Sequence, residues 1–128
     1  MARISAFTVV VPDYDTAIAF YIGALGFDLL EDTRLSDTKR WVRVAPPGAE
    51  TAILLAQPKN DLERTAIGNQ TGGRVGFFLE VEDFDAAYKR MKAHAVDFRE
   101  APRSEPYGKV VVFADPFENL WDLIEPAS

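Results

Sequence analysis

The chain has 128 residues, a formal net charge of −6 and no cysteine, with 48% hydrophobic and 27% charged residues. This size and composition predict one soluble globular domain with its own core. The absence of cysteine excludes disulfides and thiolate metal sites, and the single histidine, His94, excludes multi-histidine metal sites. The acidic balance argues against a nucleic-acid partner, because phosphate binding needs clustered Lys and Arg.

No stretch reaches the roughly 18 consecutive apolar residues that a membrane-spanning helix needs. The first residues, Met1 to Ser5, lead directly into a strand pattern instead of the apolar block of a signal peptide. We therefore expect a cytoplasmic protein with no membrane partner.

The first half of the chain predicts a strand over 7–11, a helix from the cap region at Asp13 and Asp15 to about Ala24, and later strands over 40–46 and 51–58. Alternating β-branched and aromatic residues indicate the strands. The helix has an apolar stripe of Ala17, Phe20, Tyr21 and Leu25. Between the halves, residues 60–67 have a capped start and predict one or two helical turns that end at Gly68.

The second half repeats this order, with a strand over 75–81, a helix from Asp83 to about His94, and strands over 109–115 and 120–126. The pattern Asp-aromatic-Asp-x-Ala at Asp13 returns at Asp83, and Pro58 returns as Pro126. The spacing indicates a duplication of one β-α-β-β-β module. We expect modules at 1–58 and 74–128, joined by a connector over 59–73 into one domain spanning 1–128. The stretch 100–108, with Pro102, Pro106 and Gly108, predicts a loop that crosses a cavity rim.

Two paired modules, a Val-Val-Pro-Asp-x-x-x-Ala-Ile-x-Phe-Tyr opening at 10–21 and an Asp-Pro-x-x-Asn-x-Trp-Asp-Leu ending at 115–123 resemble the vicinal oxygen chelate superfamily. That superfamily includes glyoxalase I, extradiol dioxygenases, fosfomycin-resistance transferases and bleomycin-resistance binding proteins. The resemblance implies an α+β fold in which cup-shaped mixed sheets hold the ligand inside and carry helices outside. It does not by itself imply one activity, because this fold hosts unrelated chemistries.

The resemblance also implies where metal-using members place their ligands. Counted along this chain, those positions are occupied by Ala6, Leu54, Arg74 and Asp122. Ala6 and Leu54 have no lone pair to donate, and Arg74 is a permanent cation. Only Asp122 can ligate, so we expect no metal and no cofactor, and we expect metal-dependent lyase or dioxygenase activity to be absent.

Candidate ligand contacts follow from strand parity. Arg74 and Asp122 are predicted to face one cavity. There they either clamp a ligand through polar contacts or form an internal ion pair with each other; the remaining alternative is that they are exposed at the surface. The other candidates are Thr8, Phe78, Glu80, Tyr107 and Trp41. Glu80 is either a general base or a solvated strand end, and Tyr107 either closes over a ligand or is an ordinary turn tyrosine.

Three further positions carry specific expectations. The strand spacing of Trp41 and Trp121 favours core positions over cofactor stacking. His94, where the second helix should end, is expected to be structural or exposed, since a histidine there interacts favourably with the helix dipole. Glu118 stands where the family turn usually has glycine, so a positive φ there would strain the backbone.

These observations favour a metal-independent protein that binds a small amphipathic or partly aromatic molecule and forms a homodimer. The alternative is an enzyme of the lactoylglutathione lyase-like or dioxygenase-like group with an atypical site. A third possibility is a structural or regulatory dimer whose cup is filled by its own side chains.

Overall fold

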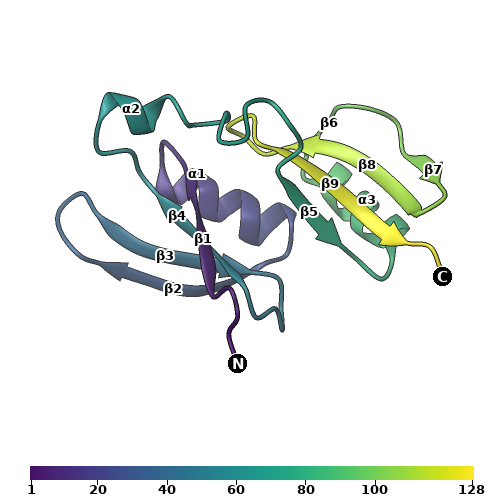
Figure 1. Cartoon of the computed structure of the whole chain (residues 1–128), viewed down its shortest axis with the longest axis horizontal. Helices are drawn as coiled ribbons and strands as arrows, with labels where there is room; N and C mark the ends of the chain where they lie inside the picture. The colour runs from purple at the N-terminus through teal and green to yellow at the C-terminus, as the bar shows by residue number, and fades with distance from the viewer. The chain divides into compact units, whose positions relative to one another are not determined.

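The computed structural model describes residues 1–128 and divides the chain into two compact units, Met1–Ile67 and Gly68–Ser128, called unit 1 and unit 2 below. Each unit consists of one mixed β-sheet with a helix against one face (Figure 1). The predicted α+β fold with two mixed sheets is confirmed. No helix of the structure has the length and apolarity that crossing a membrane requires.

Unit 1 contains seven elements: β1 (Ala6–Val10), α1 (Tyr14–Ile18), the π-helix η1 (Ala19–Ala24), β2 (Asp28–Arg34), β3 (Arg40–Ala45), β4 (Ala52–Ala56) and α2 (Asp61–Arg64). Its strands are ordered β1-β4-β3-β2. The β1–β4 pair is parallel and the other pairs are antiparallel. Strand β1 therefore lies at one edge of the sheet and the β2–β3 hairpin at the other.

Unit 2 contains β5 (Phe77–Glu80), α3 (Phe84–Ala93), β6 (Asp97–Phe98), β7 (Arg103–Glu105), β8 (Gly108–Ala114) and β9 (Leu120–Pro126). The strand order is β5-β9-β8-β6, and β7 also pairs with β8. The β5–β9 pair is parallel, as is β1–β4 in unit 1. The long strand β2 of unit 1 is thus replaced in unit 2 by two short strands, β6 and β7.

The two sheets share a register as well as an order. Thr8 is opposite Leu54 in unit 1, and Phe78 is opposite Asp122 in unit 2. On the other side of Leu54, strand β3 places Arg43, and on the other side of Asp122, strand β8 places Val112. Leu54 and Asp122 therefore occupy the same position of the repeated topology.

Both predicted main helices begin at the expected caps. The Asp13 carboxylate accepts a hydrogen bond from Thr16 N at 2.8 Å, and the Asp83 carboxylate accepts one from Ala86 N at 3.1 Å. These bonds satisfy backbone donors that a helix leaves unpaired at its start. The first helix continues as η1, and its change to π-helical hydrogen bonding was not predicted, because caps and an apolar stripe do not distinguish the two helix types.

Each helix covers the face of its own sheet that carries the buried side chains. In unit 1 these include Val9, Val42, Val44, Ile53 and Leu55, packed under Ala17 and Tyr21. In unit 2 they include Leu79, Val111, Phe113, Trp121 and Leu123, packed under Phe84 and Met91. Side chains of the opposite strand parity lie on the other face, which we call the open face of each unit.

Two expectations are wrong. Residues 100–108 are not only a loop, because Arg103–Glu105 form β7, which pairs with β8. Pro102 and Pro106 flank β7 and limit it to three residues. A strand this short among turn-forming residues gives no strand pattern in the sequence. Trp41 is not a core residue: it is 39% exposed on the open face of unit 1, whereas Trp121 is buried as predicted.

Other local predictions are confirmed. The helix α2 begins after Asn60, whose side chain accepts from Glu63 N at 2.8 Å. His94 is the exposed C-cap of α3. Glu118 has a φ of 77°, so a non-glycine residue does occupy the left-handed region in this turn.

Candidate functional site

The open face of unit 2 has Asp122 at its centre. Phe78 lies beside Asp122 on β5, and Val112 lies beside it on β8. The Phe78 side chain is 67% exposed, which is unusual for so large an apolar group in the middle of a strand. The face therefore presents a carboxyl group between two apolar side chains.

The carboxyl group of Asp122 is incompletely satisfied. Its Oδ1 atom is buried and has no hydrogen-bond partner. Burial raises the pKa of Asp122 above its usual range, the positive charge of Arg103 opposes this rise, and the negative charge of Glu100 adds to it. Most buried side-chain oxygens have hydrogen-bond partners, so Oδ1 of Asp122 is a candidate for contact with a bound molecule.

The charges near Asp122 belong to a network centred on Arg103. The guanidinium of Arg103 forms ion pairs with Glu100 at 3.1 Å and with Glu105 at 2.9 Å, and donates to the Tyr107 hydroxyl at 3.3 Å. The same Glu100 accepts from the backbone N–H of Val112 at 3.0 Å. Bonds to Tyr107, Glu105 and Glu100 raise the pKa of Arg103, so the guanidinium stays charged and held in place.

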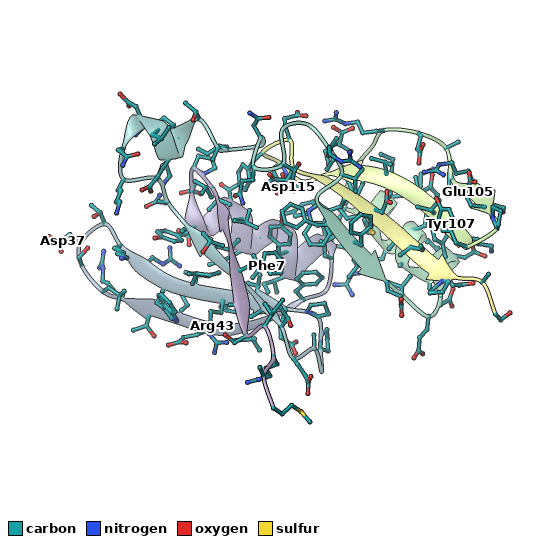
Figure 2. All side chains as sticks on the ribbon, viewed as in Figure 1. Phe7, Asp37, Arg43, Glu105, Tyr107 and Asp115 are labelled. Carbon is teal, nitrogen blue, oxygen red and sulfur yellow. The ribbon has the colours of Figure 1, made fainter.

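Figure 2 shows Glu105 and Tyr107 close together at the end of the β7–β8 hairpin. Tyr107 is 52% exposed, so its ring is accessible while its hydroxyl is held by Arg103. Sequence reasoning identified Tyr107 but missed Glu100, Arg103 and Glu105. The opposite charges of Arg103 and Glu105, two residues apart between Pro102 and Pro106, were the available signal, since such residues of a strand lie on one face.

The remaining predicted residues lie further from Asp122 or in the other unit. Glu80 is exposed at the end of β5. Arg74 is exposed before β5 begins and forms no ion pair, so the charged groups acting on Asp122 are Arg103 and Glu100. Thr8 and Trp41 are exposed side chains of unit 1, on β1 and β3.

The family model described as "Glyoxalase/Bleomycin resistance protein/Dioxygenase superfamily" matches residues 3–123, which is nearly the whole chain. The chain belongs to this superfamily. An uncharacterized protein of Shewanella frigidimarina is 47% identical over 118 residues, covering 91% of this chain and 87% of that protein. The sequence resemblance stated above is therefore confirmed.

Solved structures of similar proteins agree with the fold of the chain. TnmS3, described as an antibiotic binding protein from Streptomyces sp. CB03234, is 30% identical with a TM-score of 0.80, covering 99% of this chain and 98% of that one. UcmS2 is 33% identical with a TM-score of 0.82, covering 98% of each chain. The likeness spans both units.

The metal positions of the superfamily can be tested against the register of the strands. The pairs Thr8–Leu54 and Phe78–Asp122 match in the two registers, so counting back two residues from Thr8 and from Phe78 matches Ala6 with Gly76. The assignment of Arg74 to this position is therefore shifted by two residues. Gly76 has no side-chain donor atom either.

The donor set does not fit a divalent metal. Of the matched positions only Asp122 carries an oxygen ligand, whereas Ala6, Leu54 and Gly76 carry none. No group of three or more His, Cys, Asp or Glu side chains in the structure could hold a metal ion. One carboxylate does not provide the three or four protein ligands typical of catalytic metal sites.

Proposed function

We propose that the chain is a metal-independent binding protein for a small amphipathic or partly aromatic molecule. The observation that carries the proposal is the Asp122 carboxyl group, which has a buried oxygen without a partner beside the exposed ring of Phe78. A site of this kind suits a ligand with a hydrogen-bond donor next to a flat apolar surface.

The network around Arg103 supports this proposal by making the site rigid. Arg103 is bound to Glu100, Glu105 and Tyr107, so none of these groups needs to become ordered when a ligand binds. Preorganised groups retain more of the interaction energy as affinity. Tyr107 then supplies a second accessible ring near the polar part of the site.

The remaining proposed contacts lie at the margins of this face and in unit 1. Arg74 and Glu80 are exposed on either side of Phe78 along the chain, and we propose that they contact polar parts of the ligand. Thr8 and Trp41, on the open face of unit 1, are proposed contacts of a ligand bound to that unit itself. The description of TnmS3 as an antibiotic binding protein supports a binding role for a chain of this sequence similarity.

One observation favours a second candidate function. The raised pKa of Asp122 is the kind of shift found in general acids and bases, so an enzyme that uses Asp122 for proton transfer without a metal is the alternative. Glu100 and Arg103 would then tune that carboxyl group. Turnover of a bound compound that is lost in Asp122→Asn would favour this alternative over simple binding.

A homodimer in the cytoplasm is part of the same proposal. Strands β1 and β5 each form an edge of their sheet, and unpaired edges are commonly covered in native proteins. Light scattering at micromolar concentration should give twice the chain mass of 14.2 kDa. A particle of the single-chain mass would overturn the dimer, and fractionation of cells producing the protein tests its location.

The binding proposal is tested by titrating bleomycin, which the family description names, and a panel of amphipathic aromatic antibiotics in the presence of EDTA. We expect saturable binding of at least one compound, and a loss of at least about tenfold in affinity in Asp122→Ala. Asp28→Ala, which removes an exposed carboxylate that forms no ion pair, is the matched control. Equal affinities of the two variants, or binding that requires an added divalent metal, would contradict the proposal.

A further inference from the structure

We propose that unit 1 contains a separate binding site, a small pocket beside α2 that takes an aliphatic carboxylate. The residues that line it are Pro12, Gln57, Pro58, Arg64 and Ile67. None of them belongs to the contacts proposed for the open faces, so this site goes beyond the proposed function. Its volume of about 280 Å³ lies just below the roughly 300–1,000 Å³ of typical ligand pockets, so we expect a small ligand.

The pocket lies where the parallel strands β1 and β4 end. Pro12 follows the end of β1 by two residues, and Pro58 follows the end of β4 by two residues. The two strand ends are joined, since Val11 N donates to Ala56 O at 2.8 Å and Gln57 Nε2 donates to Pro12 O at 3.1 Å. In α/β sheets, ligands commonly bind outside the carboxyl ends of parallel strands. This pocket has that position in the β1–β4 pair.

Helix α2, which follows β4 (Figure 1), supplies the charged side of the pocket. Its start is capped by Asn60, whose side chain accepts from Glu63 N at 2.8 Å. Arg64 N donates to Asn60 O at 3.0 Å, and Ile67 N donates to Arg64 O at 3.2 Å. These bonds hold the backbone of Arg64 and Ile67 at the pocket.

Arg64 is the only charged residue that lines the pocket. Its guanidinium has five N–H donors, and the structure uses one of them, from Nη1 to Asp61 Oδ1 at 2.7 Å. Both side chains of this ion pair are exposed, so the pair contributes little to stability and a ligand can replace Asp61 at low cost. The planar guanidinium matches the two oxygens of a carboxylate.

No acidic side chain lines the pocket to oppose an anion. Asp13, which follows Pro12 in the chain, caps α1 by accepting from the N–H and the hydroxyl of Thr16 at 2.8 Å and 2.6 Å. The net charge of −6 does not exclude an anionic ligand either, because charges more than about 8 Å apart are largely screened at physiological salt. Arg64 therefore decides the sign of the ligand.

The uncharged residues of the pocket define the rest of the ligand. Pro12, Pro58 and Ile67 offer apolar surface, which suits a short branched aliphatic tail. The Gln57 amide is anchored through Nε2, while its Oε1 atom accepts no hydrogen bond in the structure. This oxygen can accept from a donor on the ligand, such as the ammonium group of an amino acid.

The test is an NMR titration with isovalerate, its neutral amide isovaleramide, and L-valine, which adds an ammonium group to isovalerate. We expect saturable shifts of the backbone amides of Gln57, Arg64 and Ile67 with isovalerate and much weaker ones with isovaleramide. Arg64→Gln should weaken isovalerate binding about fivefold. Asp61→Asn should tighten it about twofold, because it removes the competing carboxylate. Arg3→Gln, which removes an exposed arginine that forms no ion pair, is the matched control and should change nothing.

The outcomes separate this site from the proposed function. Absence of saturable shifts at the pocket, equal effects of Arg64→Gln and Arg3→Gln, or equal binding of isovaleramide would overturn the site and leave the role of Asp122 standing. Opposite effects of Arg64→Gln and Asp61→Asn support it, whatever the antibiotic panel shows for Asp122→Ala. Tighter binding of L-valine than of isovalerate would then assign an amino acid to the pocket, and the reverse order a free short-chain acid.

Discussion

Units 1 and 2 share a strand order and a register but differ at the centre of the open face. In unit 1, Leu54 lies between Thr8 and Arg43. The Nε atom of Arg43 forms an ion pair with Glu31 at 3.1 Å, so the guanidinium beside Leu54 has a partner. Unit 1 therefore shows that the repeated topology accepts an apolar residue at this position.

Unit 2 places Asp122 at the matched position, between Phe78 and Val112. Its Oδ1 atom is buried without a hydrogen-bond partner, which disfavours the folded state. The fold does not need a carboxylate at this position, because the matched position of unit 1 is occupied by the apolar side chain of Leu54. A residue that costs stability and is not needed for folding fits a role in binding.

The turns of the two units make a second comparison. Gly48 of unit 1 has a φ of 79°, and Glu118 of unit 2 has a φ of 77°. Glycine adopts this conformation freely, whereas a residue with a side chain is strained in it. The side chain of Glu118 forms an ion pair with Arg99. This contact is exposed and offsets only part of the strain.

The largest expected effect concerns the strand connection of unit 2. The buried Asp115 carboxylate accepts from Phe117 N at 2.9 Å, Asn119 N at 2.9 Å and Asn119 Nδ2 at 2.7 Å. Asp115→Ala leaves these donors unpaired and should lower the free energy of unfolding by about 3 kcal/mol. Glu50→Ala, in the exposed connection of unit 1, should change it by less than about 0.5 kcal/mol. Urea denaturation tests both, and equal effects would show that the two connections are energetically alike.

Exchanging the two matched residues should have the next largest effect. Leu54→Asp should lower the free energy of unfolding by about 2 kcal/mol, because it replaces a half-buried apolar side chain by a carboxylate. Asp122→Leu should instead raise the free energy of unfolding by about 1 kcal/mol, because it removes an unsatisfied oxygen. Both are measured by denaturant unfolding. A destabilised Asp122→Leu variant would mean that the carboxylate supports the fold.

The two turns should respond in opposite directions. Gly48→Glu should lower the free energy of unfolding by about 1 kcal/mol through backbone strain alone, since no atom lies within 4 Å of the added Cβ. Glu118→Gly should raise it by roughly 0.5 kcal/mol, because released strain exceeds the lost surface ion pair. Thermal unfolding of both variants measures these changes. A loss of stability in Glu118→Gly would show that the Arg99 pair outweighs the strain.

The smallest expected effect is a pH dependence at Asp122. Because burial raises the pKa of Asp122 in the folded state above its ordinary value of 3.8, its protonated form favours folding. This contribution is fully present below pH 3.8 and is lost as the pH rises through the folded-state pKa. Asp122→Asn does not titrate, so its stability relative to the original chain should rise from acidic to neutral pH. A difference that stays constant or falls would contradict the raised pKa.

Much of the fold could be predicted because the decisive signals are local. The caps at Asp13 and Asp83, the strand alternation and the 70-residue spacing between these caps lie in the printed sequence. The π-helical continuation at Ala19 and the three-residue β7 could not be predicted, since neither changes the apolar pattern. The exposure of Trp41 also depends on which strands flank β3, and this pairing is not local.

The candidate site was predicted only in part for the same reason. Phe78 and Asp122 follow from parity within β5 and β9, but the charged neighbours of Asp122 come from β7 and the residues before it. Counting along the chain predicts that Arg74 and Asp122 face one cavity, as a clamp on a ligand, as an internal ion pair or with surface exposure. The strand register shifts the counted position from Arg74 to Gly76, and the positive charge that acts on Asp122 is that of Arg103.

The central claim is that the open face of unit 2 binds a small molecule without a metal. The most direct measurement is chemical-shift mapping of backbone amides while a compound that binds in EDTA is added. We predict that the largest changes occur at Phe78, Val112 and Asp122, and that they are absent in Asp122→Leu. Changes confined to the helix-covered residues Leu79 and Leu123, or changes that appear only when a divalent metal is added, would contradict the claim.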